Sequence, residues 1–222
     1  SLFRNKNKYL GVDIGTSNLK IVELDKHRGY PNLSTYGAID LGDDVIRSES
    51  REVEEKIVRS LGKLIKASEA KGSRAIASLP GFSVFTTMLK LPKMNEEELS
   101  EAIKWEAKRY IPFPIEDILL DWEMVKAQSS LLPSSKKEML PGKEEMEIFL
   151  TAVPKNIVRR YSNIFEGVHL KLIGLEPEAV ALGRALVSPE EGCTMIVDIG
   201  ATATEICIVK DNIPKLNLSV DT

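Results

Sequence analysis

A short strand–turn–strand motif near the start of the chain recurs near its end, and this repeat most limits the possible folds. In the first copy, Val12 and Ile14 flank Asp13 in an apolar run typical of a buried strand, and a turn of small residues follows. The sequence Val-Asp-Ile-Gly at residues 12–15 recurs at residues 197–200. Two copies of one supersecondary unit predict two related half-domains facing each other across a cleft.

The turns of both copies suit an anion. Turns of small and hydroxylated residues direct backbone N–H groups and hydroxyls into one concavity, which favours phosphate, and a preceding aspartate can hold a hydrated divalent cation. A single aspartate of this kind also occurs as a simple turn cap, but the recurrence favours a phosphate site. The candidate cofactor-binding residues are Asp13, Gly15, Thr16, Ser17, Asn18, Asp198, Gly200, Ala201 and Thr202. Asp13 and Asp198 are the candidate metal ligands.

The composition narrows the class of protein. A chain of 222 residues with 43% hydrophobic and 28% charged residues can bury a core, and its net charge of −3 gives no electrostatic reason to expect nucleic acid as a partner. Cys193 and Cys207 lie in apolar runs without metal-binding spacing, which predicts buried free thiols and a cytoplasmic protein. His27 and His169 fit no metal-ligand pattern.

The order of the predicted elements indicates an α/β fold with a partly parallel sheet. A strand at 33–41 precedes an amphipathic helix from Glu52 to Lys71, which Gly72 is expected to stop, and a strand from Arg74 to Leu79 follows. After an interruption, helices near 154–167 and 177–186 flank a strand at 170–175. The predicted parent domain therefore comprises residues 8–80 and 148–190, and residues 191–222 begin a second lobe.

Residues 81–147 are predicted to form an inserted α+β subdomain. Asn95 caps a helix whose last turn runs into the segment from Tyr110 to Pro114, which is either a simple helix stop or an exposed docking ledge. The polar stretch 127–145, interrupted by prolines, reads as a mobile loop between two strands.

The paired hairpins resemble the phosphate-1 and phosphate-2 motifs of the actin–hexokinase–chaperone ATPase superfamily. Lys20 matches the lysine that actin-like members carry after the first aspartate, which implies a phosphate contact and adds Lys20 to the cofactor-binding residues. The segment 175–182, Leu-Glu-Pro-Glu-Ala-Val-Ala-Leu, resembles a chaperone motif whose first glutamate lies near the attacking water. By this resemblance Glu176 is the candidate catalytic residue, although a glutamate before proline also serves as a plain helix start. The implied cofactors are ATP and Mg²⁺, on an actin-like, ribonuclease-H-like fold.

Within this superfamily, the segments 9–17 and 102–113 look most like PilM, the cytoplasmic actin-like component of type IV pilus assembly, and the insert resembles the 1C subdomain that PilM shares with FtsA. The resemblance implies a nucleotide-binding scaffold that binds the cytoplasmic tail of a PilN-like inner-membrane protein and relays to the pilus motor ATPases. It also implies a location at the inner face of the cytoplasmic membrane, reached through that partner.

Three alternatives remain open from the sequence. They are an FtsA-like division protein, a GspL-like cytoplasmic domain of type II secretion, and a sugar or acetate kinase, which the insert disfavours. The chain is expected to stop within the second lobe, before the adenosine-binding turn. The chain is therefore expected to bind ATP weakly or not at all. By the resemblance, any hydrolysis is expected to be slow.

Overall fold

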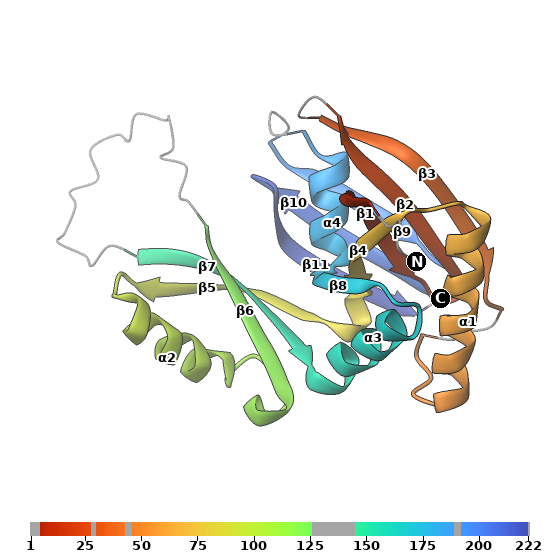
Figure 1. Ribbon diagram of the computed structural model, residues 1–222. Helices are drawn as coiled ribbons and strands as arrows, with labels where there is room; N and C mark the ends of the chain where they lie inside the picture. The colour runs from red at the N-terminus through yellow and green to blue at the C-terminus, as the bar shows by residue number, and fades with distance from the viewer. Residues whose placement is uncertain (1–4, 28–29, 43–45, 126–144, 189–191, 222) are drawn as a thin grey trace. The chain divides into compact units, whose positions relative to one another are not determined.

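The computed structural model describes residues 5–27, 30–42, 46–125, 145–188 and 192–221, and most of the loop expected at 127–145 lies outside these ranges. The chain divides into two compact units, residues 1–84 with 156–222, and residues 85–155 (Figure 1). The second unit overlaps the predicted insert, 81–147. It extends to Lys155 because β7 (Glu145–Pro154) pairs along its whole length with its neighbouring strands.

The first unit is built on a five-stranded mixed sheet with the order β3-β2-β1-β4-β8. The strands β1 (Asn5–Ile14), β2 (Asn18–His27) and β3 (Tyr30–Asp40) form an antiparallel meander. The strands β4 (Gly72–Leu79) and β8 (Lys171–Pro177) run parallel to β1. The carboxyl ends of β1, β4 and β8 therefore meet at one edge of the sheet.

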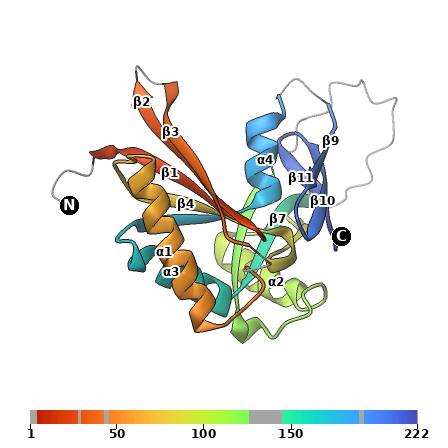
Figure 2. The same ribbon diagram turned by 90° about the vertical axis from the view of Figure 1, so that its right-hand side faces the viewer.

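Two helices cover one face of this sheet, and a third lies on the other side (Figures 1 and 2). Helix α1 (Arg51–Ala67) begins at Ser50, whose side chain accepts from the Val53 N–H, and α3 spans Lys155–Gly167. Helix α4 (Glu178–Leu186) lies on the opposite side. None of the helices in the described ranges is long and apolar enough to cross a membrane.

Helix α1 ends differently from the prediction, which placed Gly72 at its stop. The helix ends at Ala67, and Glu69 adopts a left-handed conformation with φ of 55°. The N–H groups of Glu69 and Ala70 bond to the carbonyls of Lys66 and Ile65, which is a Schellman motif. Gly72 instead opens β4, where a side chain would collide with Leu10.

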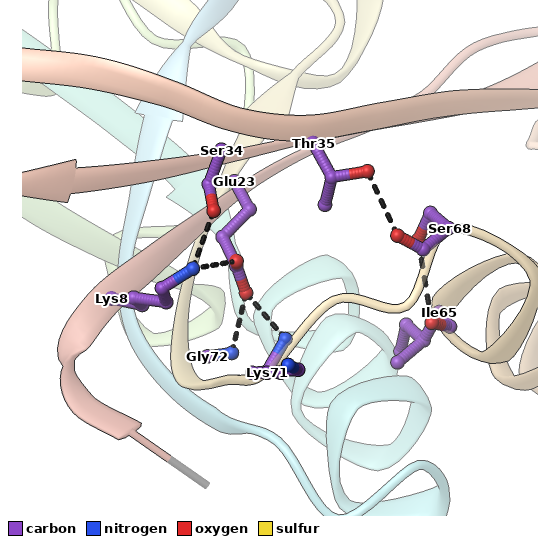
Figure 3. A network of polar contacts seen from close by, with 8 residues as sticks. All are labelled: Lys8, Glu23, Ser34, Thr35, Ile65, Ser68, Lys71 and Gly72. Carbon is purple, nitrogen blue, oxygen red and sulfur yellow. Dashed lines mark hydrogen bonds and ion pairs between the residues drawn. The ribbon is translucent and has the colours of Figure 1, made fainter.

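The end of α1 and the meander are joined through one buried carboxylate (Figure 3). Glu23 on β2 is 1% exposed and accepts from Lys8 Nζ at 2.9 Å. It also accepts from the backbone N–H groups of Lys71 and Gly72, at 2.5 and 2.6 Å. Burial alone would raise the pKa of Glu23, but these bonds outweigh it and lower that pKa below its ordinary value.

A second, three-stranded antiparallel sheet completes the first unit. It has the order β11-β10-β9, formed by β9 (Thr194–Ile199), β10 (Ala203–Lys210) and β11 (Ile213–Asp221). One face packs against α4, where Gly183 lies beside Val209. The other face exposes a row of apolar side chains, namely Met195, Val197, Ile199, Leu216, Leu218 and Val220.

The two cysteines differ from the prediction of two buried thiols. Cys207 on β10 is buried, and burial raises the pKa of its thiol to about 11. Cys193 is exposed, because it precedes β9 and contributes nothing to the packed face of the sheet.

The inserted unit is a three-stranded antiparallel sheet packed against one helix. Its strands β5 (Phe85–Pro92), β7 and β6 (Ile118–Val125) lie in the order β5-β7-β6, and α2 (Glu96–Ala107) is capped by Asn95. The shared core is apolar and consists mainly of Leu89, Leu91, Leu99, Ile103, Ile118, Ile148 and Leu150.

The Glu23 contacts predict a measurable loss of stability on mutation. The Glu23→Gln substitution removes the charge that pairs with Lys8 and weakens the bonds to two backbone donors, so the free energy of unfolding should fall by about 2–3 kcal/mol. Because the folded pKa is lowered, the stability contributed by Glu23 is present above pH 4.5, its ordinary pKa, and is lost as the pH falls through the folded value.

Urea unfolding of the wild type and the variant between pH 3 and 7 tests this expectation. The matched control is Glu55→Gln, at an exposed ion pair on α1, which should leave the stability almost unchanged. Equal stability of Glu23→Gln and wild type at pH 7 would contradict the role given to Glu23.

Candidate functional site

The two predicted hairpin turns have the same backbone geometry. Between β1 and β2, the Gly15 N–H donates to the Asn18 carbonyl at 2.9 Å. Between β9 and β10, the Gly200 N–H donates to the Ala203 carbonyl, also at 2.9 Å. A side chain at Gly200 would place its Cβ 2.8 Å from that carbonyl oxygen, so the turn requires glycine. The sequence repeat is therefore also a structural repeat.

A polar row crosses the sheet at the first hairpin. Asp13 pairs in register with Lys20 on β2, and Lys20 Nζ lies 3.1 Å from Asp13 Oδ2. On the other side, the Ser78 hydroxyl of β4 donates to Asp13 Oδ1 at 2.9 Å. Ser78 in turn pairs in register with Glu176 on β8. Lys20, Asp13, Ser78 and Glu176 thus lie side by side at the edge where the parallel strands end.

The second hairpin contributes two further carboxylates. Asp198 on β9 pairs in register with Glu205 on β10, which is 7% exposed. Glu205 accepts from the backbone N–H of Gly81, in the short turn that follows β4. Burial raises the pKa of Glu205, the Gly81 bond opposes this, and the charges of Asp198 and Asp13 add to the rise.

Glu178, the first residue of α4, interacts with the carboxylates of both hairpins, Asp13 on the first and Asp198 and Glu205 on the second. Its side chain is hydrogen-bonded to Asp198. Burial raises the pKa of Glu178 to about 8, with further contributions from the charges of Asp13, Glu205 and Asp198. Asp13 and Asp198, each from its own hairpin, therefore act on the same two glutamates. We name Asp13, Glu178, Asp198 and Glu205 the acidic cluster.

The predicted catalytic residue, Glu176, has a different environment. Both of its carboxylate oxygens bind the guanidinium of Arg184 on α4, one of them at 2.6 Å from Nη2. Glu176 is thus held by a bidentate ion pair beside the acidic cluster, while Glu178 bonds directly within it. The proposed role of Glu176 in orienting water remains a prediction.

Several polar atoms at the site have no partner within the described residues. They include Asn18 Oδ1 in the first turn, Thr202 Oγ1 in the second, and Glu205 Oε2, all of them buried. Thr16 and Ser17 are half-buried, and Ala201 is exposed. Since buried polar atoms are usually hydrogen-bonded, unpartnered atoms in both turns fit a site that receives a polar ligand.

The carboxylates alone do not make a complete metal centre. Over the residues that the structure describes, no group of three or more His, Cys, Asp or Glu side chains is arranged to hold a metal ion. Asp13 and Asp198 still suit Mg²⁺, since this ion commonly uses one or two carboxylates together with waters and substrate phosphates.

Sequence reasoning missed Ser78, Gly81, Glu178 and Glu205. Glu205 and Glu178 carried a usable signal, because Glu205 lies on the second hairpin and Glu178 directly follows the Glu176-Pro177 pair. Ser78 lies near the end of β4 and Gly81 in the turn after it. Sheet register brings Ser78 to Asp13, and the packing of the second sheet brings Glu205 to Gly81.

Comparison with known proteins assigns the chain to a family. The sequence profile of the family described as "Type IV pilus assembly protein PilM" matches residues 11–214. The chain belongs to the PilM family. This confirms the family predicted from the hairpins and from the segment 102–113.

Solved structures agree on the fold. A PilM–PilN type IV pilus biogenesis complex contains a chain with a TM-score of 0.77 and 22% identity, and the match covers 98% of this chain and 62% of that chain. The cytoplasmic domain of EpsL, from the type II secretion system of Vibrio cholerae, has a TM-score of 0.59 at 13% identity, covering 96% and 71%. The ethanolamine utilization protein EutJ from Carboxydothermus hydrogenoformans has a TM-score of 0.53 at 15% identity, covering 98% and 53%.

These matches confirm the predicted α/β, actin-like fold. The family match and the higher score favour the pilus family over the type II secretion alternative. The chain spans 62% of the length of the PilM chain that it matches.

The acidic cluster predicts an unusual dependence of stability on pH. Glu178 titrates at about 8 in the folded chain and at about 4.5 when unfolded, so between these values only the folded state keeps the proton. The stability contributed by this proton is therefore present below pH 4.5 and is lost as the pH rises to 8. The Glu178→Gln variant should lack this decline and should be more stable than the wild type at pH 8.

Urea unfolding at pH 5, 6.5 and 8 measures the effect. Asp198→Asn removes one of the charges that raise the pKa of Glu178. In this variant the free energy of unfolding should therefore stop falling at a lower pH than in the wild type. An identical pH profile for wild type and Glu178→Gln would show that Glu178 is not held as the acid.

Proposed function

We propose that this chain is a nucleotide-binding component of type IV pilus assembly, and that its two hairpin turns hold the phosphates of ATP. The observation that carries the proposal is the convergence of Asp13 and Asp198, from the two copies of the repeat, on Glu178 and Glu205. Membership of the PilM family supports the process in which it takes part.

In this proposal the backbone N–H groups and hydroxyls of both turns bind the phosphate oxygens. Lys20 contributes a positive charge next to Asp13, and Thr202 contributes a buried hydroxyl that has no partner among the described residues. Mg²⁺, when bound, supplies charge neutralisation for the phosphates, and Asp13 and Asp198 are the residues that would hold it. The ion would also relieve the repulsion among the carboxylates of the acidic cluster.

Two glutamates are candidates for orienting a water molecule. Glu176 is fixed by Arg184 at the end of β8, which gives a rigid acceptor beside the polar row. Glu178 lies within the acidic cluster and holds a proton near neutral pH, so it is the poorer acceptor there. Glu176 is therefore the better candidate for orienting water, and any hydrolysis at this site is expected to be slow.

The partner proposed for this chain is the cytoplasmic tail of a PilN-like inner-membrane protein, with pilus motor ATPases as further partners. The match to a PilM–PilN complex supports a PilN-like partner. Binding such a tail would place the chain in the cytoplasm at the inner face of the membrane.

The phosphate site can be tested in this chain directly. Both hairpins are present, so inorganic tripolyphosphate with Mg²⁺ should bind even if contacts to adenosine are weak. Calorimetric titration should show Mg²⁺-dependent binding, and Asp13→Asn and Asp198→Asn should each weaken it by at least about tenfold, roughly 1.4 kcal/mol.

Asp211→Asn is the matched control. Asp211 has φ of 56° in the turn between β10 and β11, a conformation that asparagine also adopts readily, and it lies outside the acidic cluster. Unchanged affinity in both hairpin variants would remove the proposed site.

The partner contact is expected on the ledge Tyr110–Pro114. Ile111 is buried in the inserted unit, whereas Tyr110 and Phe113 are 48% and 50% exposed, which suits an apolar docking surface. The double variant Tyr110→Ala/Phe113→Ala should weaken binding of a synthetic PilN-type tail peptide in a fluorescence titration. Trp105→Ala, which removes an exposed aromatic ring of the same unit outside the ledge, is the control; loss of binding only in this control would place the contact elsewhere.

A further inference from the structure

One short segment contacts a carboxylate of each hairpin. This segment, Ser78–Gly81, leaves the end of β4 and is named the connector. At its first residue, the Ser78 hydroxyl donates to Asp13 Oδ1 at 2.9 Å. At its last, the Gly81 N–H donates to Glu205 Oε1. Asp13 lies on β1 of the first hairpin and Glu205 on β10 of the second, so a segment of four consecutive residues is bonded to both halves of the repeat.

The carboxylate of Glu205 fills the space beside Gly81 that a side chain would occupy. A Cβ atom at Gly81 would collide with both carboxylate oxygens of Glu205 and with the carbon between them. The carboxylate therefore lies directly against the backbone of the connector. Movement of Glu205 alters the hydrogen bonding of this backbone, because the carboxylate bonds the Gly81 N–H directly.

The contacts continue past Gly81 in the same turn. The guanidinium of Arg47 lies 4.7 Å from the centroid of the Phe82 ring. Arg47 also forms an ion pair with Asp221 at the end of β11. The turn Gly81–Ser83 thus follows β4 of the first sheet and contacts β10 of the second directly and β11 through Arg47.

The chain leads from this turn directly into the inserted unit. Only Val84 separates Ser83 from Phe85, the first residue of β5 and of the second unit. The inserted unit is therefore joined covalently to a segment that is hydrogen-bonded to both Asp13 and Glu205. It also contains both tryptophans of the chain, Trp105 and Trp122, and Trp122 packs against its core.

We propose that Ser78 and Gly81 are positioning residues of the phosphate site, and that the connector transmits the occupancy of that site to the inserted unit. This inference rests on the proposed function, because it needs an anion and a cation at the hairpins. When these ligands bind, Asp13 and Glu205 interact with the charges of the ligands, and their hydrogen bonds to Ser78 and Gly81 weaken. The Ser78 hydroxyl and the Gly81 N–H adjust to the new carboxylate positions, and the start of β5 follows.

Because both tryptophans lie in the inserted unit, their fluorescence reports on that unit alone. Mg²⁺ with tripolyphosphate is the probe, and calorimetry measures its binding independently of the fluorescence. The wild type should show a saturable change in tryptophan emission at the concentrations that give calorimetric binding. Hydrogen exchange at the amides of β5 should change over the same range.

The decisive variants remove or retain the hydroxyl group of residue 78. Ser78→Ala should weaken binding by about tenfold, as expected for one lost bond to a charged group, and should abolish most of the emission change even at saturation. Ser78→Thr keeps a hydroxyl in a strand that tolerates threonine and should restore the change. Ser162→Ala, which removes a hydroxyl bonded to the backbone of its own helix, should behave like the wild type.

The outcomes separate the two proposals. Binding without an emission change in the wild type, or a full change at saturation in Ser78→Ala, would overturn the role of the connector and leave the phosphate site intact. No calorimetric binding of the probe to the wild type would overturn the proposed function and this inference with it.

Discussion

Repulsion between like charges is the constraint on which the first unit depends. Four carboxylates, Asp13, Glu178, Asp198 and Glu205, come from four different elements, and burial together with their mutual repulsion raises the pKa of Glu178 and Glu205. Each has an identified compensating contact. Asp13 accepts from Ser78 and Lys20, Glu205 accepts from Gly81, and Asp198 is bonded to the acid form of Glu178. Such a cluster lowers stability, and departures of this kind from favourable electrostatics are expected at functional sites.

The sheet topology explains why these groups meet. Since β1, β4 and β8 are parallel, Asp13, Ser78 and Glu176 reach the same edge of the sheet. The antiparallel partner of β1 adds Lys20 to this row. Helix α4 then begins directly after β8 and places Glu178 against the second hairpin. The two copies of the repeat are thus joined by one strand and one helix, and Glu23 fixes the opposite end of the same strands.

The features that could be predicted from the sequence are those that neighbouring residues determine, namely the turns and strands of the repeated hairpin. The repeated Asp-Ile-Gly was visible because the second turn needs glycine at Gly200, the first turn is tight at Gly15, and the strands need alternating apolar residues. The prediction that α1 ends at Gly72 was wrong, because Glu69 adopts the left-handed conformation that glycine usually adopts. Gly72 is needed instead for close packing against Leu10. Ser78 and Gly81 could not be predicted, since their significance comes from strand register and from a carboxylate 124 residues away in sequence.

The central claim is that the two hairpins hold one ligand together. The most direct test is a two-dimensional NMR titration of the ¹⁵N-labelled chain with Mg²⁺ and tripolyphosphate, following the backbone amides of Gly15 and Gly200. The account predicts that both amides shift along the same binding curve, because one set of phosphates contacts both turns. Shifts confined to one hairpin, or two curves with different midpoints, would contradict it.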